Sequence, residues 1–111
     1  MDDAGRHLLV RVKLIASDHG GVAGPKTSGY RPAWEIGATQ DGNPVHTSGR
    51  LVFPPGMDLA PGAEADARLY PMTPESWDHV AAGQDLRAYE GSRLVATAIV
   101  LDVEGMSPND P

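Results

Sequence analysis

Alternating apolar and polar side chains dominate this sequence and predict short β-strands. Residues 63–70 read Ala-Glu-Ala-Asp-Ala-Arg-Leu-Tyr, so every second side chain is apolar. A repeat of two is typical of a strand with one face in a core and one face in water. Residues 8–16 and 33–39 alternate in the same way. These segments predict three half-buried strands.

Turn-forming residues separate these strands from further candidates. Glycine and proline supply the backbone angles and the missing N–H group that chain reversals use. The turn signals are Asp41-Gly42, Pro54-Pro55-Gly56, Pro61-Gly62 and Glu90-Gly91-Ser92. Three further candidate strands lie at residues 49–53, 85–89 and 93–103.

One short helical excursion interrupts the strands. Thr73 suits an N-cap and Pro74 suits the first helical position, so we expect a helix or turn over about residues 73–82 that ends at Gly83. Six short strands without a long helix predict an all-β fold, a small antiparallel barrel or sandwich.

The last candidate strand is apolar on both faces, which needs an explanation. One face carries Leu94, Ala96, Ala98 and Val100, and the other carries Val95, Ile99, Leu101 and Val103. Only one face can point into a barrel, and sizeable apolar patches are seldom left in water. The second face is therefore covered either by the chain's own excursion at residues 71–83 or by a partner, which includes a second copy of the chain.

The chain length limits the fold to one domain. With 111 residues it matches the commonest domain size of about 100–150 residues. We expect a barrel over residues 8–104 and flexible ends at residues 1–7 and 105–111. This length excludes large catalytic architectures such as a triosephosphate-isomerase-type barrel.

Composition and charge narrow the function classes. The formal net charge is −6 and the nine basic residues are dispersed, which disfavours binding to a phosphate backbone. Cysteine is absent, which excludes disulfides and thiolate metal sites. The longest apolar stretch, residues 94–101, is too short to span a membrane. We expect a cytoplasmic protein that does not enter a membrane.

Candidate catalytic and cofactor motifs are weak. Residues 20–27 approach a phosphate-binding loop, but Pro25 stands where the second glycine belongs and has no N–H to offer a phosphate. The histidines at positions 7, 19, 46 and 79 show no spacing typical of a helical metal site. We expect no nucleotide, no metal, no cofactor and no catalytic residue.

Several motifs in order resemble the third, C-terminal domain of translation elongation factor Tu over roughly residues 8–103. The matching segments are Gly29-Tyr30-Arg31-Pro32, Pro61-Gly62, residues 69–72, Leu86-Arg87 and residues 90–100. The resemblance implies a six-stranded antiparallel barrel that is not itself catalytic. In the family this domain packs on the GTPase domain and contacts aminoacyl-tRNA and the nucleotide-exchange factor. This chain resembles that domain alone, without the GTPase domain.

The resemblance carries over only part of the tRNA contact. Glu90 matches the family's glutamate that contacts the tRNA backbone, but Ala33 and Gly42 replace its glutamine and threonine. Together with the charge of −6, this disfavours tRNA binding. The alternative interpretation of Glu90-Gly91 is a tight turn that needs glycine at positive φ.

The candidate binding residues form a small set. The Arg31 guanidinium could bind a carboxylate or phosphate, with Tyr30 and Trp34 as an aromatic anchor beside it. The alternative is a structural corner in which Tyr30 packs beneath the loop. Glu90 and Arg93 complete the set. We expect a non-enzymatic module that binds a protein partner or a second copy of itself, with weak RNA binding as the alternative and a small enzyme as a less favoured one.

Overall fold

The computed structural model describes residues 7–16, 24–77 and 79–104. Flexible ends are expected at residues 1–7 and 105–111. Residues 1–6 and 105–111 lie outside the described residues, whereas His7 belongs to the first strand. Residues 20–23 of the segment compared with a phosphate-binding loop also lie outside the described residues.

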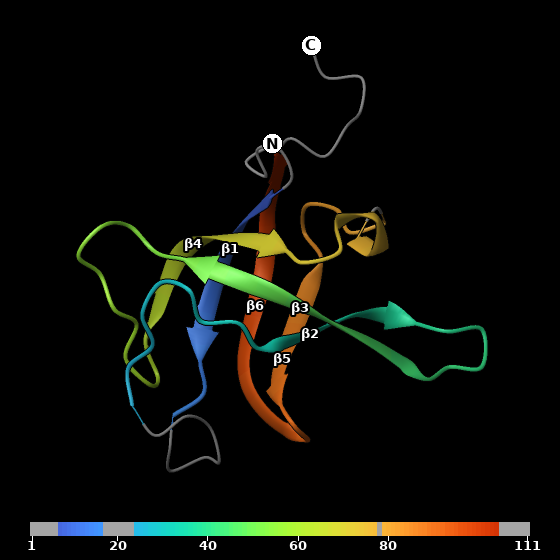
Figure 1. Ribbon diagram of the computed structural model, residues 1–111, viewed down its shortest axis with the longest axis horizontal. Coiled ribbons are helices and arrows are strands. Elements are labelled where there is room, and N and C mark those ends of the chain that lie inside the picture. Colours follow the sequence, from blue (N-terminus) through green and yellow to red (C-terminus); the bar gives the residue numbers. More distant parts are fainter. Residues whose placement is uncertain (1–6, 17–23, 78, 105–111) are drawn as a thin grey trace.

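The described chain is an all-β closed barrel of antiparallel strands, as predicted. The strands are β1 (His7–Leu14), β2 (Ala33–Ala38), β3 (Pro44–Val52), β4 (Glu64–Pro71), β5 (Asp85–Glu90) and β6 (Arg93–Glu104). Their order around the barrel is β1-β4-β3-β2-β5-β6, and pairing of β6 with β1 closes it (Figure 1). One 3-10 helix, η3 (Pro74–Trp77), lies between β4 and β5.

The core follows from the alternation that the sequence shows. In β1, Leu8, Val10, Val12 and Leu14 are fully buried, whereas the intervening Arg11 and Lys13 are exposed. The inward residues of the other strands complete an aliphatic core that also holds Trp34 and Trp77. Burial of such side chains is worth about 1.5–3 kcal/mol each and dominates the stability of the fold.

The β2–β3 hairpin extends further than the sequence predicts. Strand β3 begins at Pro44 rather than at residue 49. Pairing of β2 with β5 stops at Glu35, and pairing of β3 with β4 starts at Gly49, so the rest of the hairpin pairs only with itself. This ribbon projects from the barrel (Figure 1). The first five residues of β3, which lie in this ribbon, have no fully buried side chain. They therefore need no apolar face, and the sequence shows no alternation by which to recognise them as a strand.

The excursion before β5 carries a single 3-10 turn. Hydrogen bonds of the i to i+3 type join Ser76 N–H to the Thr73 carbonyl at 2.9 Å and Val80 N–H to the Trp77 carbonyl at 3.0 Å. Gly83, with φ of 91°, turns the chain toward β5. Trp77 and Val80 are both buried and belong to the core cluster. The excursion therefore contributes to the core of the barrel.

The two tryptophans differ in how their N–H groups are satisfied. Trp34 Nε1 donates to the Gly49 carbonyl at 3.1 Å, and Gly49 leaves room for the indole because a Cβ there would lie 3.1 Å from Trp34 Cδ1. Trp77 Nε1 is buried and finds no acceptor among the described residues. A buried donor without a partner costs about 1–3 kcal/mol.

We expect Trp34→Phe to lower the free energy of unfolding by about 1–2 kcal/mol more than Trp77→Phe does. Both substitutions remove a similar apolar volume, but only the first removes a satisfied hydrogen bond. Urea denaturation with an unchanged m-value measures the difference. An equal or larger loss in Trp77→Phe would contradict this explanation.

Candidate functional site

Charged and aromatic side chains gather at the turn between β5 and β6. This group, named here the Glu90 cluster, consists of Lys26, Tyr30, Glu90 and Arg93. Glu90 and Arg93 are register partners on either side of the turn, and Gly91 within it has φ of 64°. The tight turn inferred from Glu90-Gly91 is therefore present, and it places the two charged side chains next to each other.

Backbone pairing brings Tyr30 to this turn from a distant part of the sequence. Gly29 N–H donates to the Leu51 carbonyl at 2.8 Å, and Leu51 N–H donates to the Tyr30 carbonyl at 2.9 Å. The segment before β2 is thereby fixed along β3. The half-buried Tyr30 ring then reaches the β5–β6 turn.

Three groups converge on the carboxylate of Glu90. The Tyr30 hydroxyl donates to Glu90 Oε2. Arg93 Nη2 donates to Glu90 Oε1 at 3.2 Å, and Lys26 Nζ lies 3.8 Å from Oε2. Lys26 Nζ also lies 4.7 Å from the centroid of the Tyr30 ring, within the range of a cation–π contact. Each oxygen of the carboxylate is thus occupied within the chain.

These contacts fix the protonation states in the cluster. The hydrogen bond from Tyr30 lowers the pKa of Glu90, and Arg93 and Lys26 lower it further. Burial raises the pKa of the Tyr30 hydroxyl, and the hydrogen bond to Glu90 adds to this effect. At neutral pH the tyrosine is a protonated donor and the glutamate an ionised acceptor, which is the strong, charge-assisted form of this hydrogen bond.

Lys26 is the member of the cluster that the sequence did not predict. Its backbone forms an isolated antiparallel bridge with Leu59, with both N–H to carbonyl distances at 2.8 Å. The bridge joins segments far apart in the sequence, and Lys26 follows a proline and several glycines without a periodic pattern. No local signal connected it to Glu90.

Trp34 and Arg31 do not form the binding pair that the sequence suggested. Trp34 is fully buried and faces the core, so its role as an aromatic anchor at the surface was wrong. The period of two explains this, because Pro32, Trp34 and Ile36 all point inward. Arg31 points to the exposed side of the chain, and Tyr30 reaches Glu90 rather than packing beside Arg31.

Two bulges in β6 divide the apolar face predicted on this strand. The register with β5 skips Val95, and the register with β1 skips Leu101. Each bulge reverses the alternation, because an extra residue shifts the following side chains to the opposite face. Val95 is consequently fully buried, and Val103 packs against the core. The single four-residue face was therefore wrong.

Ile99 remains on the outside of β6, with 47% of its surface exposed, beside the half-buried Leu101. The excursion at residues 71–83 does not cover it. Its Trp77 and Val80 side chains are in the core, and Met72 is exposed but does not line the surroundings of Ile99. Gly83 and Gln84 contact β6 by backbone hydrogen bonds with Val100 at 2.7 and 2.9 Å. The sequence allows two ways to cover this face, the chain's own excursion or a partner. The excursion leaves Ile99 exposed, so this side chain is free to contact a partner.

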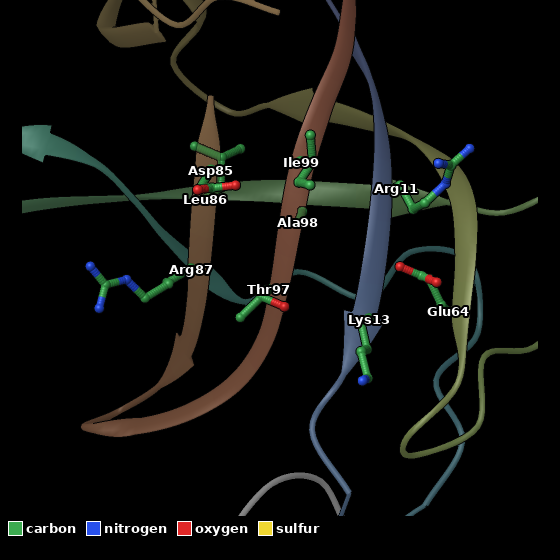
Figure 2. Close-up of a pocket in the computed structure, with 9 residues that line it drawn as sticks. All are labelled: Arg11, Lys13, Glu64, Asp85, Leu86, Arg87, Thr97, Ala98 and Ile99. Atoms are coloured by element: carbon green, nitrogen blue, oxygen red, sulfur yellow. The ribbon is translucent and has the colours of Figure 1, made fainter. Parts of the chain in front are cut away.

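A shallow groove of about 400 Å³ surrounds Ile99 on the outer faces of β1, β6 and β5 (Figure 2). We name it the β6 groove; its lining includes Arg11, Lys13, Arg87, Thr97 and Ile99. Lys13 and Arg87 flank Thr97 as register partners on the two neighbouring strands, and Arg11 flanks Ile99 in the next row. The groove therefore combines one exposed apolar side chain with charged walls, in which Arg11, Lys13 and Arg87 stand with the carboxylates of Glu64 and Asp85.

Other aromatic side chains on the outer surface are already in contact with neighbours. Tyr70 lies 5.1 Å from the ring of His7 and 4.9 Å from the guanidinium carbon of Arg50. Tyr89 stacks on His46 with 5.1 Å between ring centroids, and its hydroxyl donates to Glu35 at 3.3 Å. The contacts of Tyr70 and the hydrogen bond of Tyr89 to Glu35 join neighbouring strands as cross-strand contacts do, whereas the rings of Tyr89 and His46 stack across β2, which lies between their strands.

Two further properties hold for residues 7–16, 24–77 and 79–104. No group of three or more histidine or carboxylate side chains is arranged to hold a metal ion. No helix in this part of the chain has the length and apolar character needed to cross a membrane.

No known protein-family profile and no curated protein sequence matches the chain. The resemblance to the third domain of elongation factor Tu, drawn from the motifs at residues 29–32, 61–62, 69–72, 86–87 and 90–100, therefore stays a prediction from the sequence.

The Glu90 cluster makes stability depend on pH in the acid range. Because the pKa of Glu90 is lower in the folded chain than its ordinary value of 4.5, its contribution is present above pH 4.5 and is lost as the pH falls through the lowered pKa. We expect Glu90→Gln to be about 1 kcal/mol less stable than wild type at pH 7. This difference should shrink progressively as the pH is lowered below 4.5.

Urea denaturation over a pH series measures this difference. Glu75→Gln, an exposed carboxylate on η3, is the matched control and should leave the pH profile of stability unchanged. Tyr30→Phe should weaken the pH dependence, because it removes the largest cause of the lowered Glu90 pKa. A Glu90→Gln effect that is the same at all pH values would contradict the assignment.

Proposed function

We propose that this chain is a non-enzymatic binding module that contacts a protein partner through the β6 groove. The observation that carries the proposal is the exposure of Ile99, 47% of whose surface is in contact with solvent in the middle of a strand face. Large apolar side chains at the centre of an interface, ringed by polar residues, are typical of protein docking sites.

The sequence resemblance supports the same proposal. The third domain of elongation factor Tu is a non-catalytic barrel that works by contact with other parts of the translation machinery. In this proposal the chain is a cytoplasmic protein that resembles this domain and competes for a protein that binds the factor. The acidic net charge of −6 favours a protein partner over RNA.

Affinity capture from the native host followed by mass spectrometry tests the proposal. We expect wild type to recover a partner that Ile99→Asp recovers about tenfold less, since a buried charge costs well over 1.4 kcal/mol. Met72→Asp is the matched control, because Met72 is the other large exposed apolar side chain in the described chain, at 50% exposure, and does not line the groove. A partner recovered equally by all three chains would contradict docking at the β6 groove.

RNA binding is the second candidate, because the cations Lys26 and Arg93 gather at the single carboxylate of Glu90. Titration of tRNA at low ionic strength tests it, since phosphate contacts are strongest there. If RNA binds at this point, Lys26→Gln and Arg93→Gln should each weaken binding and reduce the salt dependence by about one counterion. Absence of binding at low salt would exclude this candidate.

A further inference from the structure

The β6 groove carries two cations that have no partner in the described chain. Lys13 and Arg87 form no ion pair or hydrogen bond there, whereas Arg11 is engaged with Asp66 at 2.9 Å. In Figure 2, Lys13 and Arg87 extend to opposite sides of β6, with Thr97 between them. Free cations on a chain of net charge −6 are available for a negatively charged group from outside.

The strand register places these groups in one row. Thr97 is the partner of Lys13 on β1 and of Arg87 on β5. Because neighbouring strands lie about 4.8 Å apart, the backbones that carry the two cations are about 10 Å apart, with the Thr97 hydroxyl halfway between. A carboxylate above Thr97 can accept a hydrogen bond from the hydroxyl. Figure 2 shows the exposed Arg87 side chain extended away from Thr97, and rotation about its side-chain torsions brings the guanidinium toward such a carboxylate.

The acidic residues of the groove lie outside this row or at its edge. Asp85 is the register partner of Ile99, one row further along β6. Glu64 is the partner of Lys13 on β4, on the side of Lys13 away from Thr97. The two residues that flank Thr97 directly on the neighbouring strands are therefore both cationic.

Ile99 sets the second requirement on a ligand. It follows Thr97 by two residues on the same face of β6, and side chains two apart on a strand are about 6.6 Å apart. An extended segment that lies along β6 presents its own alternate side chains at the same spacing. When the carboxylate of such a segment lies above Thr97, the side chain two positions away lies above Ile99, where an apolar group fits.

We propose that the β6 groove recognises an extended peptide segment with an acidic side chain two positions from an apolar one. This inference rests on the proposed function, because it names the chemistry of the partner at the same groove. The carboxylate is bound between Lys13 and Arg87, and the apolar side chain covers Ile99. Charge complementarity at the row of Thr97 distinguishes this occupant from a purely apolar one.

Peptide titrations followed by ¹⁵N–¹H NMR on the full chain test the inference. The probes are threonine-rich peptides with aspartate and leucine two positions apart, in both orders, and matched peptides with asparagine in place of aspartate. We expect shifts centred on the Thr97 and Ile99 amides and binding about fivefold or more weaker for the asparagine peptides. Equal binding of the aspartate and asparagine peptides would overturn the inference.

Neutralising variants test the same point from the protein side. The double variant Lys13→Gln and Arg87→Gln should bind the aspartate peptide at least about fivefold more weakly and lose its preference over the asparagine peptide. Arg68→Gln, an exposed cation on β4 outside the groove lining, should bind like wild type. If both sets of variants bind alike, the carboxylate site is not between Lys13 and Arg87.

Two further outcomes separate this inference from the proposed function. If Ile99→Ser weakens binding of both peptides equally while wild type does not prefer aspartate, the docking face is retained and the carboxylate site is overturned. If sedimentation shows a concentration-dependent dimer that Ile99→Ser abolishes, the occupant is a second copy and the peptide inference fails. The host-capture experiment with Ile99→Asp decides independently whether the face binds a protein at all.

Discussion

Closure of the sheet between β1 and β6 is the constraint on which the rest of the structure depends. These strands come from opposite parts of the described sequence and pair along the whole of β1. Closure leaves free edges only on the projecting end of the β2–β3 hairpin, among the described strands, and requires every strand of the barrel to divide its side chains between inside and outside. The aliphatic core, the exposed rows of charges and the position of the β6 groove all follow from this division.

The same closure explains why the sequence predicted the inward faces of β1 and β4 better than that of β6. In β1 and β4 the alternation of apolar and polar residues gave the inward face directly, and the structure confirms it. Strand β6 pairs with β5 on one side and β1 on the other, and its bulges at Val95 and Leu101 adapt it to both. Because β6 is apolar on both faces, a bulge in it leaves no visible change in the pattern of residue types. A face assigned by taking every second residue is therefore wrong beyond the bulge.

Candidate site residues were predictable where local geometry decides and unpredictable where distant segments meet. The Glu90-Gly91 signal located the turn, and the tight turn placed Arg93 beside Glu90. The contact of Lys26 with this carboxylate depends on a bridge to Leu59, and the hydrogen bond of Trp34 depends on the space that Gly49 leaves for the indole. Neither contact has a counterpart in the residues adjacent in sequence, whereas the inward direction of Trp34 follows from the alternation in β2.

The adjacency of the two outermost paired residues has a topological consequence. His7 and Glu104 are register partners, so the polypeptide enters and leaves the barrel at nearly the same point. A domain with this property can be inserted into a loop of another protein with little separation of the two flanking segments. It can also be circularly permuted, with a short linker joining residue 104 to residue 7 and a new opening at an exposed turn such as Gly42. In such a permuted chain the strands follow one another in a different order along the sequence, while their arrangement in the barrel stays the same.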